Sequence, residues 1–130
     1  MTNKYMYFVA NWKMYGDLKS IKSLNKVIKF SKSNKNYKYK IIYCPPNTLL
    51  HPFINKLKKS TISIGAQNCH IHESYGPFTG SVSSKMIKNI GAEFVIIGHS
   101  ENRSSGDTDF IINKKIKSSI NNGLKVIFCF

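Results

Sequence analysis

Five short runs rich in Val, Ile, Phe and Tyr recur along this 130-residue chain, and longer segments with helical patterns separate them. The runs occupy residues 7–10, 40–43, 62–66, 94–97 and 126–130. Their composition is typical of β-strands. Strands that alternate with helices predict a parallel sheet whose connections are right-handed crossovers. The chain is therefore assigned to the α/β class.

The segments between these runs carry helix signals. Apolar residues at three- and four-residue spacing over 18–28 predict an amphipathic helix whose lysines face solvent. A short helix is expected over 49–57, and another over 83–90, with Ser83 as its N-cap and Gly91 as its stop. A last helix is marked by Phe110, Ile112, Ile116 and Ile120, with Asp107 or Thr108 as its cap and Gly123 at its end.

The strand starts lie between about 20 and 35 residues apart, near the ~31 residues per unit of a 250-residue (β/α)8 barrel. At that pace the chain holds about four βα units plus a fifth strand, so we expect an incomplete (β/α)8 barrel. We expect residues 1–130 to be the N-terminal part of a single domain. An apolar strand at the end of the chain would leave an unpaired edge. The sequence is therefore expected to be truncated.

The charge balance is strongly basic, with 20 Lys and Arg against 6 Asp and Glu, and Arg103 is the only arginine. This charge, together with the aromatic and lysine run 37–40, leaves open a nucleic-acid-binding module or a non-catalytic basic remnant. A specific nucleic-acid function is not expected, because the lysines are dispersed and no binding motif is present. The codons for Lys, Asn and Ile are AT-rich, so nucleotide bias in the gene is a second explanation for the high positive charge.

The remaining composition limits the setting of the protein. No run approaches the ~20 apolar residues that cross a bilayer, so no membrane association is expected. Cys44, Cys69 and Cys129 are odd in number and widely spaced, which predicts a reducing, cytoplasmic location. The segment 69–73 contains zinc-type ligands but lacks a second ligand pair, so no metal site is expected.

Reactive residues of parallel α/β folds lie just beyond the carboxyl ends of strands. Asn11 and Lys13 follow the first run, and strand alternation places them on one face, where an ammonium suits a phosphate. His99 follows the fourth run near the start of a helix, where a neutral imidazole can donate to a carbonyl. The long connection after Gln67 is expected to be functional or to contact a partner.

Four segments in order carry a resemblance to a known family. They are Asn11-Trp12-Lys13-Met14, Gly65-Ala66-Gln67-Asn68-Cys69, Gly76-Pro77-Phe78-Thr79-Gly80 and Gly98-His99-Ser100-Glu101. The chain resembles the first half of triosephosphate isomerase. The resemblance implies a TIM barrel that interconverts dihydroxyacetone phosphate and glyceraldehyde 3-phosphate in glycolysis and gluconeogenesis. It implies a homodimer that uses neither cofactor nor metal.

The resemblance also implies residue roles. Lys13 would bind the phosphorylated substrate with Asn11 beside it, and His99 would be the neutral electrophile. Glu101 and Ser100 would support the site from behind these groups. The residues implied at the dimer interface are Met14, Gly76, Phe78 and Thr79.

Several features of the family are missing from the sequence. The catalytic glutamate after strand six, the mobile loop beyond it and the later glycine-rich phosphate turns do not occur in the 130 residues, so the chain alone is expected to be inactive. Ser81 and Asn102 stand where the family usually has glutamate and arginine, and segment 104–106 is about one residue short.

Overall fold

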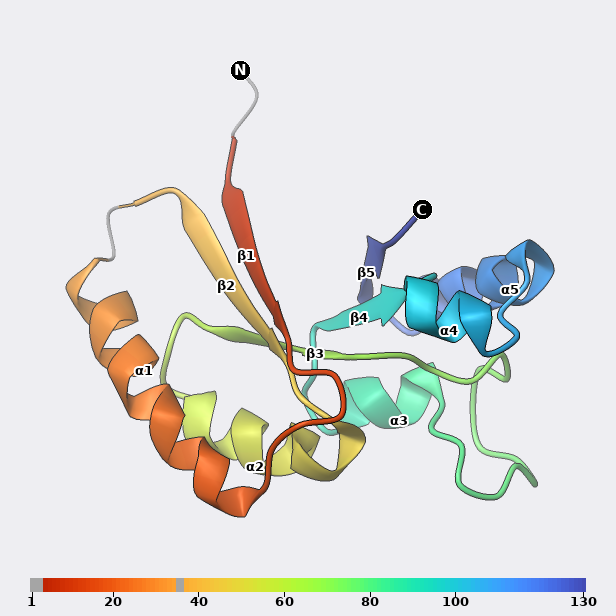
Figure 1. Ribbon diagram of the computed structural model, residues 1–130, viewed down its shortest axis with the longest axis horizontal. Coiled ribbons are helices and arrows are strands. Elements are labelled where there is room, and N and C mark those ends of the chain that lie inside the picture. The colour runs from red at the N-terminus through yellow and green to blue at the C-terminus, as the bar shows by residue number, and fades with distance from the viewer. Residues whose placement is uncertain (1–3, 35–36) are drawn as a thin grey trace.

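Five parallel strands form one sheet in the order β1-β2-β3-β4-β5 (Figure 1). The computed structural model describes residues 4–34 and 37–130. The strands are β1 (Met6–Asn11), β2 (Tyr39–Cys44), β3 (Ser63–Ala66), β4 (Phe94–Ile97) and β5 (Lys125–Phe128). Each strand pairs with the next in parallel. The predicted α/β class and incomplete barrel are confirmed, although the last strand ends at Phe128 rather than at residue 130.

Six helical elements connect the strands. They are η1 (Leu18–Ser23), α1 (Leu24–Ser33), α2 (Asn47–Leu57), α3 (Ser84–Asn89), α4 (Ser100–Ser104) and α5 (Asp109–Asn121). The single helix expected over 18–28 is instead a 3-10 turn followed by an α-helix. Asp17 and Ser20 form a reciprocal capping box at the start of η1, which fixes the tighter turn there.

The helix caps follow local chemistry. The Ser83 hydroxyl accepts a hydrogen bond from the Met86 amide and caps α3, as predicted. Thr108, one of the two residues expected to cap α5, does so by accepting from the Ile111 amide. Asp107 is not the cap, because its carboxylate binds Lys115.

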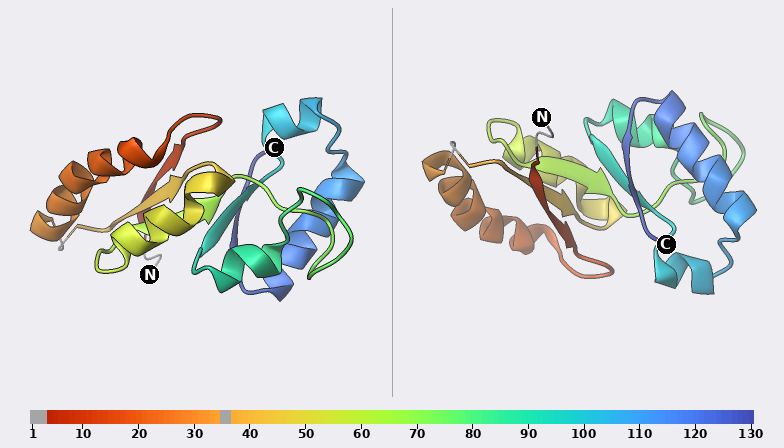
Figure 2. Two further views of the ribbon diagram at one scale, coloured as in Figure 1. Left: turned by 90° about the horizontal axis from the view of Figure 1, so that it is seen from below. Right: turned by 90° about the horizontal axis from the view of Figure 1, so that it is seen from above.

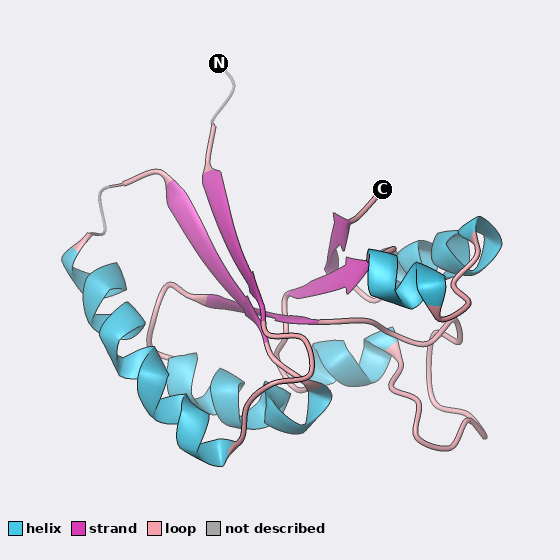
Figure 3. Cartoon of the chain, in the orientation of Figure 1, coloured by secondary structure: helices cyan, strands magenta, loops and turns pink. Residues whose placement is uncertain are grey.

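The sheet curls, and the helices lie along its outer side (Figures 1 and 3). Figure 2 shows α1 and α2 toward one end of the molecule and α3 and α5 toward the other. The main core fills the space between helices and sheet, with Leu50, Phe53, Ile87, Val95 and Ile97 almost fully buried. No helix in the described part of the chain is long and apolar enough to cross a membrane.

The inner side of the sheet is thinly covered. A small cluster of Ile42, Cys44, Phe94 and Ile96 is buried there. The edge strand β1 is thinly covered on its outer side as well, where Phe8 retains 54% of its accessible surface. Burial of apolar area is the main stabilising term of a fold, so β1 is held chiefly by its ladder with β2.

A buried ion pair ties α5 to the loop before it. The Lys115 Nζ lies 2.7 Å from Asp107 Oδ2 and donates to Asn68 Oδ1 at 3.0 Å. The side chains of Lys115 and Asp107 are only 8% and 14% exposed. Sequence periodicity gave no sign of this, because Lys115 lies among solvent-facing lysines in the sequence.

We predict that Asp107→Ala lowers the free energy of unfolding by about 3–5 kcal/mol, because it leaves the buried Lys115 ammonium without its counter-charge. Asp109→Ala is the matched control. Its carboxylate, which pairs with Arg103, is 95% exposed, so we expect a loss of at most about 1 kcal/mol. Urea unfolding followed by circular dichroism measures both, and equal losses in the two variants would contradict the prediction.

Candidate functional site

The carboxyl ends of the first three strands are joined at one edge of the sheet. Asn11 pairs with Cys44 at the end of the β1–β2 ladder, and the Trp12 amide donates to the Cys44 carbonyl at 3.0 Å. Gln67, just after β3, donates from Nε2 to the carbonyls of both Cys44 and Lys13 at 2.8 Å. One side-chain amide thereby fixes the backbone from which Lys13 projects.

Lys13 lies in a turn with an unusual backbone. Its φ of 52° is in the left-handed region, which non-glycine residues seldom adopt. The Asn11 Oδ1 accepts a hydrogen bond from the Lys13 amide at 3.0 Å. Such strain persists only where neighbouring contacts hold the backbone in place. Asn11 and Gln67 supply those contacts.

His99 is the N-cap of α4, and its ring orientation is defined by a backbone contact. The Nδ1 atom accepts a hydrogen bond from the Glu101 amide at 3.2 Å. Because Nδ1 accepts, the neutral ring carries its proton on Nε2 and can donate from there. Glu101 Oε2 is also 3.5 Å from Nδ1, but an ion pair would need a proton on the nitrogen that is already the acceptor.

Glu101 contacts Lys13 directly. Its Oε1 lies 2.9 Å from the Lys13 Nζ, and both side chains are at least half exposed. The hydrogen bond from Lys13, more than the Lys13 charge, lowers the pKa of the Glu101 carboxyl. The same bond, together with the carboxylate charge, raises the pKa of Lys13. The pair therefore holds Lys13 as an ammonium at the mouth of the sheet.

The predicted site residues share one cavity of about 230 Å³. Asn11, Lys13, His99 and Glu101 line it together with Met14. Ser100 is the first residue of α4 and is exposed. A lysine and a histidine thus line one small space. An ammonium suits an anion and an imidazole N–H can donate to a carbonyl oxygen, so this pair of residue types suits an anionic substrate with a carbonyl group.

The residues expected at an interface lie in two exposed places. Met14 follows Lys13 and is 93% exposed. Gly76, Phe78 and Thr79 are exposed in the long connection between β3 and α3. The Phe78 ring packs near His70 and His72, at centroid distances of 4.4 and 5.1 Å. A Cβ at Gly76 would come within 2.7 Å of that ring, so this loop packs on itself.

The segment 69–73, which was considered as a metal site, is occupied by other contacts. Cys69 is buried with its Sγ 3.4 Å from the Ser119 hydroxyl, and burial raises the pKa of its thiol. The Glu73 carboxylate accepts from the Asn121 amide at 3.3 Å. Within residues 4–34 and 37–130, no group of three or more such side chains is placed to hold a metal ion.

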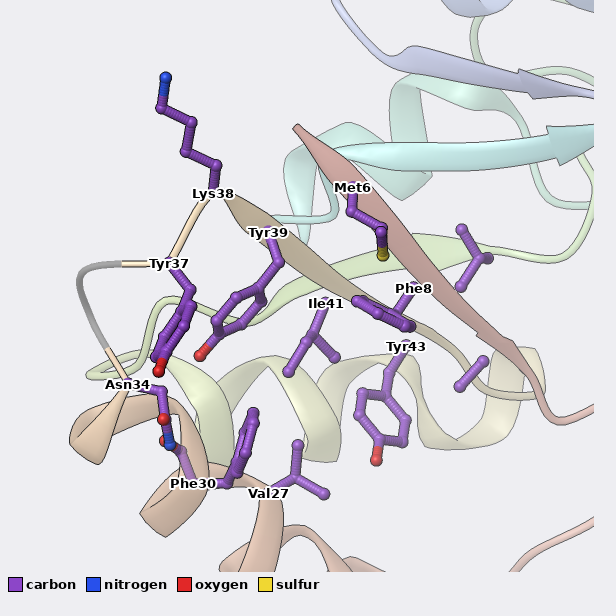
Figure 4. A pocket seen from close by; sticks show the side chains of 12 residues that line it. Met6, Phe8, Val27, Phe30, Asn34, Tyr37, Lys38, Tyr39, Ile41 and Tyr43 are labelled. Carbon is purple, nitrogen blue, oxygen red and sulfur yellow. The ribbon is translucent and has the colours of Figure 1, made fainter. Parts of the chain in front are cut away.

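A second, apolar cavity lies away from these groups. It is an apolar groove of about 700 Å³ between the outer side of β1 and β2 and helix α1 (Figure 4). Figure 4 shows the side chains of Phe8, Phe30, Ile41 and Tyr43 around it. Among the described residues that line the groove, Lys38 alone has a side chain charged at neutral pH, and most of the others are apolar or aromatic.

The sequence analysis assigned no role to two residues whose side chains bond the backbone beside the site, Gln67 and Arg103. Gln67 follows a strand, the same signal that singled out Asn11 and His99, so strand-end position could have found it. Arg103 lies within α4 and donates to the backbone carbonyls of Gly98, just after β4, and of Cys129, just after β5. Only its rarity in a lysine-rich chain could have drawn attention to it.

Fold and site together define an α/β half-barrel with a polar cavity at the carboxyl ends of its strands. The family model described as triosephosphate isomerase matches residues 6–130. The chain belongs to the triosephosphate isomerase family.

Relatives support this assignment. The triosephosphate isomerase of Dictyoglomus thermophilum is 44% identical over 122 residues, which are 92% of this chain and 48% of the relative. That of Bartonella tribocorum is 36% identical, over 95% of this chain and 48% of the relative. The crystal structure of the Bartonella henselae enzyme aligns with a TM-score of 0.88 at 34% identity, over 98% of this chain and 52% of that one. The chain thus spans about half the length of these relatives, and the matches favour neither the nucleic-acid-binding nor the remnant interpretation.

We predict that Lys13→Met raises the titration midpoint of Glu101 toward its ordinary pKa of 4.5, because the variant removes the hydrogen bond and the charge that lower it. In the unaltered chain the ion pair is present at neutral pH. It is lost as the pH falls through the lowered pKa of Glu101, and again as the pH rises above 10.5 through the raised pKa of Lys13.

Carbon-13 NMR of the glutamate carboxyl groups measures the midpoint. Lys19→Met, in exposed η1, is the matched control and should leave Glu101 unchanged. A Glu101 midpoint that does not respond to Lys13→Met would contradict the ion pair.

Proposed function

We propose that this chain is the N-terminal part of a single-domain triosephosphate isomerase, which interconverts dihydroxyacetone phosphate and glyceraldehyde 3-phosphate. The position of Lys13 and His99 on the lining of one cavity carries this proposal, because the His99 Nδ1 is bonded to backbone and leaves Nε2 to donate. A triose phosphate has the two matching groups, since its phosphate suits a cationic point charge and its carbonyl oxygen accepts an N–H donor.

Each residue has a separate role in this proposal. Lys13 binds the phosphorylated substrate and stabilises the charge that develops during the reaction, with Asn11 holding its turn. His99 polarises the substrate carbonyl from Nε2 and moves protons between the two oxygens of the enediolate. Glu101 holds the Lys13 ammonium in place before substrate enters, and Ser100 begins the helix whose amide fixes His99.

The proposed reaction needs a base to remove a proton from carbon. The resemblance assigns this role to a glutamate after strand six, beyond the five strands of this sheet. General-base catalysis typically contributes ~10²–10⁴-fold to a rate. We therefore propose that turnover requires the remaining barrel strands and that residues 1–130 alone do not catalyse the reaction.

The assembly is proposed on the same basis. Met14 and the segment with Gly76, Phe78 and Thr79 are exposed and would form the interface of a homodimer, with Thr79 reaching the partner's site. Ser81 and Asn102 stand where the family usually has a glutamate and an arginine, so the ion pair between those two charges would be absent from the interface. No cofactor or metal is proposed, and the three free thiols of the chain support a cytoplasmic location.

The proposal is tested by a coupled isomerase assay on two samples. One is the purified 130-residue chain, for which we expect the rate of buffer alone. The other is this chain co-expressed with the C-terminal half of the Dictyoglomus thermophilum relative, for which we expect turnover. His99→Gln should then reduce kcat by about 10²–10⁴-fold, because it removes the acid that polarises the carbonyl.

Two controls make the assay decisive. Lys13→Met should abolish turnover of the reassembled enzyme, whereas Lys19→Met, which removes the same charge from exposed η1, should not change it. Turnover by the 130-residue chain alone would contradict the proposed need for the second half. Full activity of the His99→Gln or Lys13→Met assemblies would contradict the assigned roles.

A further inference from the structure

Arg103 connects three separate parts of the chain through one guanidinium group. Its Nε donates to the Gly98 carbonyl at 2.7 Å, and its Nη2 donates to the Cys129 carbonyl at 3.1 Å. Its Nη1 lies 2.9 Å from Asp109 Oδ1 at the start of α5. The group also lies 6.0 Å from the centre of the Phe128 ring. The end of β4, the end of β5 and α5 thus meet at one side chain.

These contacts require the shape of an arginine. The guanidinium is planar and directs its N–H donors in fixed directions, whereas an ammonium is a compact point charge on a flexible stem. Of the 20 basic residues in this chain, Arg103 alone is an arginine. The single guanidinium of this chain therefore bonds two backbone carbonyls that follow two different strands, β4 and β5.

The Gly98 carbonyl belongs to the peptide that joins Gly98 to His99, and the Cys129 carbonyl lies against Gly98. Gly98 has a φ of +81°, and a Cβ there would lie 2.6 Å from the Cys129 carbonyl oxygen and 3.1 Å from Arg103 Nη2. The backbone at Gly98 thus passes the Cys129 carbonyl at a distance that only glycine permits, and the guanidinium that bonds this carbonyl lies beside it. The next residue is His99, whose ring depends on this backbone to reach the Glu101 amide.

We propose that Arg103 is the positioning residue of His99: by holding the carbonyls of Gly98 and Cys129 it fixes the peptide that directs the imidazole and so keeps the ring proton on Nε2. The inference rests on the proposed function only for the use made of His99. The ion pair with Asp109 is secondary, because the Asp109 side chain is 95% exposed and such pairs contribute little.

Nitrogen-15 NMR of the histidine rings tests the proposal on the ligand-free chain. In the unaltered protein at a pH where His99 is neutral, we expect Nδ1 and Nε2 to give widely separated shifts, with the proton on Nε2. Arg103→Lys keeps the charge but loses the planar fork, and the two His99 shifts should move toward each other as the tautomers mix. Asp109→Asn is the matched control and should leave them unchanged. His70 and His72, which pack around Phe78, serve as internal references.

A second variant covers the possibility that Arg103→Lys perturbs folding. Arg103→Gln retains one planar donor amide and should show a smaller displacement of the same two shifts. Unaltered His99 shifts in both variants would overturn the proposal. Loss of the native circular dichroism signal in both would also overturn it, because Arg103 would then be a general folding residue.

A kinetic arm separates this inference from the proposed function. In the assembly with the second half of the barrel, Arg103→Lys should lower kcat by roughly 10- to 100-fold while KM changes little, since Lys13 is untouched. If the assembly is inactive but the His99 shifts respond as expected, the positioning role stands and the proposed function fails. If the assembly is active and kcat is unchanged by Arg103→Lys, the positioning role fails alone.

Discussion

The site of this protein depends on the parallel register that ends its strands at one edge. In a parallel ladder the hydrogen bonds run evenly between neighbours, so the position of one strand end determines the next. At this edge Asn11 lies beside Cys44, where β1 and β2 end. At the same edge the Cys129 amide donates to the Ile97 carbonyl, where β4 and β5 end. Gln67 and Arg103 reinforce this edge by side-chain bonds to backbone carbonyls on two neighbouring segments each. The groups that could act on a substrate are carried by the residues that follow these fixed points.

Two lysine–carboxylate pairs in this chain differ in burial and in their consequences. The chain is highly basic, yet Lys13 and Lys115 are held by carboxylates in two different ways. Lys115 is buried and its pair with Asp107 secures α5 to the preceding loop. Lys13 is exposed and its pair with Glu101 keeps an ammonium ready at the cavity mouth, where solvent weakens the attraction and an anion can compete for it. The same interaction type thus stabilises a buried contact in one place and orients an exposed ammonium in the other.

The parts of the molecule that depend on local sequence patterns can be predicted from the sequence. The five strands, the Ser83 cap and the placement of Asn11, Lys13 and His99 at strand ends follow from short-range periodicity and capping chemistry. The parts that sequence reasoning missed depend on contacts between distant residues. Gln67 reaches the Lys13 carbonyl across 54 positions, and Lys115 meets Asn68 across 47. The break of the first helix into η1 and α1 was also missed, because an apolar pattern at three- and four-residue spacing fits a 3-10 turn as well as an α-helix.

The central claim is that a side chain from the turn after β1 and one from α4 meet over one mouth of the sheet. Nuclear Overhauser effects in the folded chain test it most directly. The account predicts cross-peaks between the ε protons of Lys13 and the γ protons of Glu101, alongside backbone cross-peaks between β1 and β2. Backbone cross-peaks between β1 and β2 without any contact between Lys13 and Glu101 would contradict it, because the sheet would then exist while the site did not.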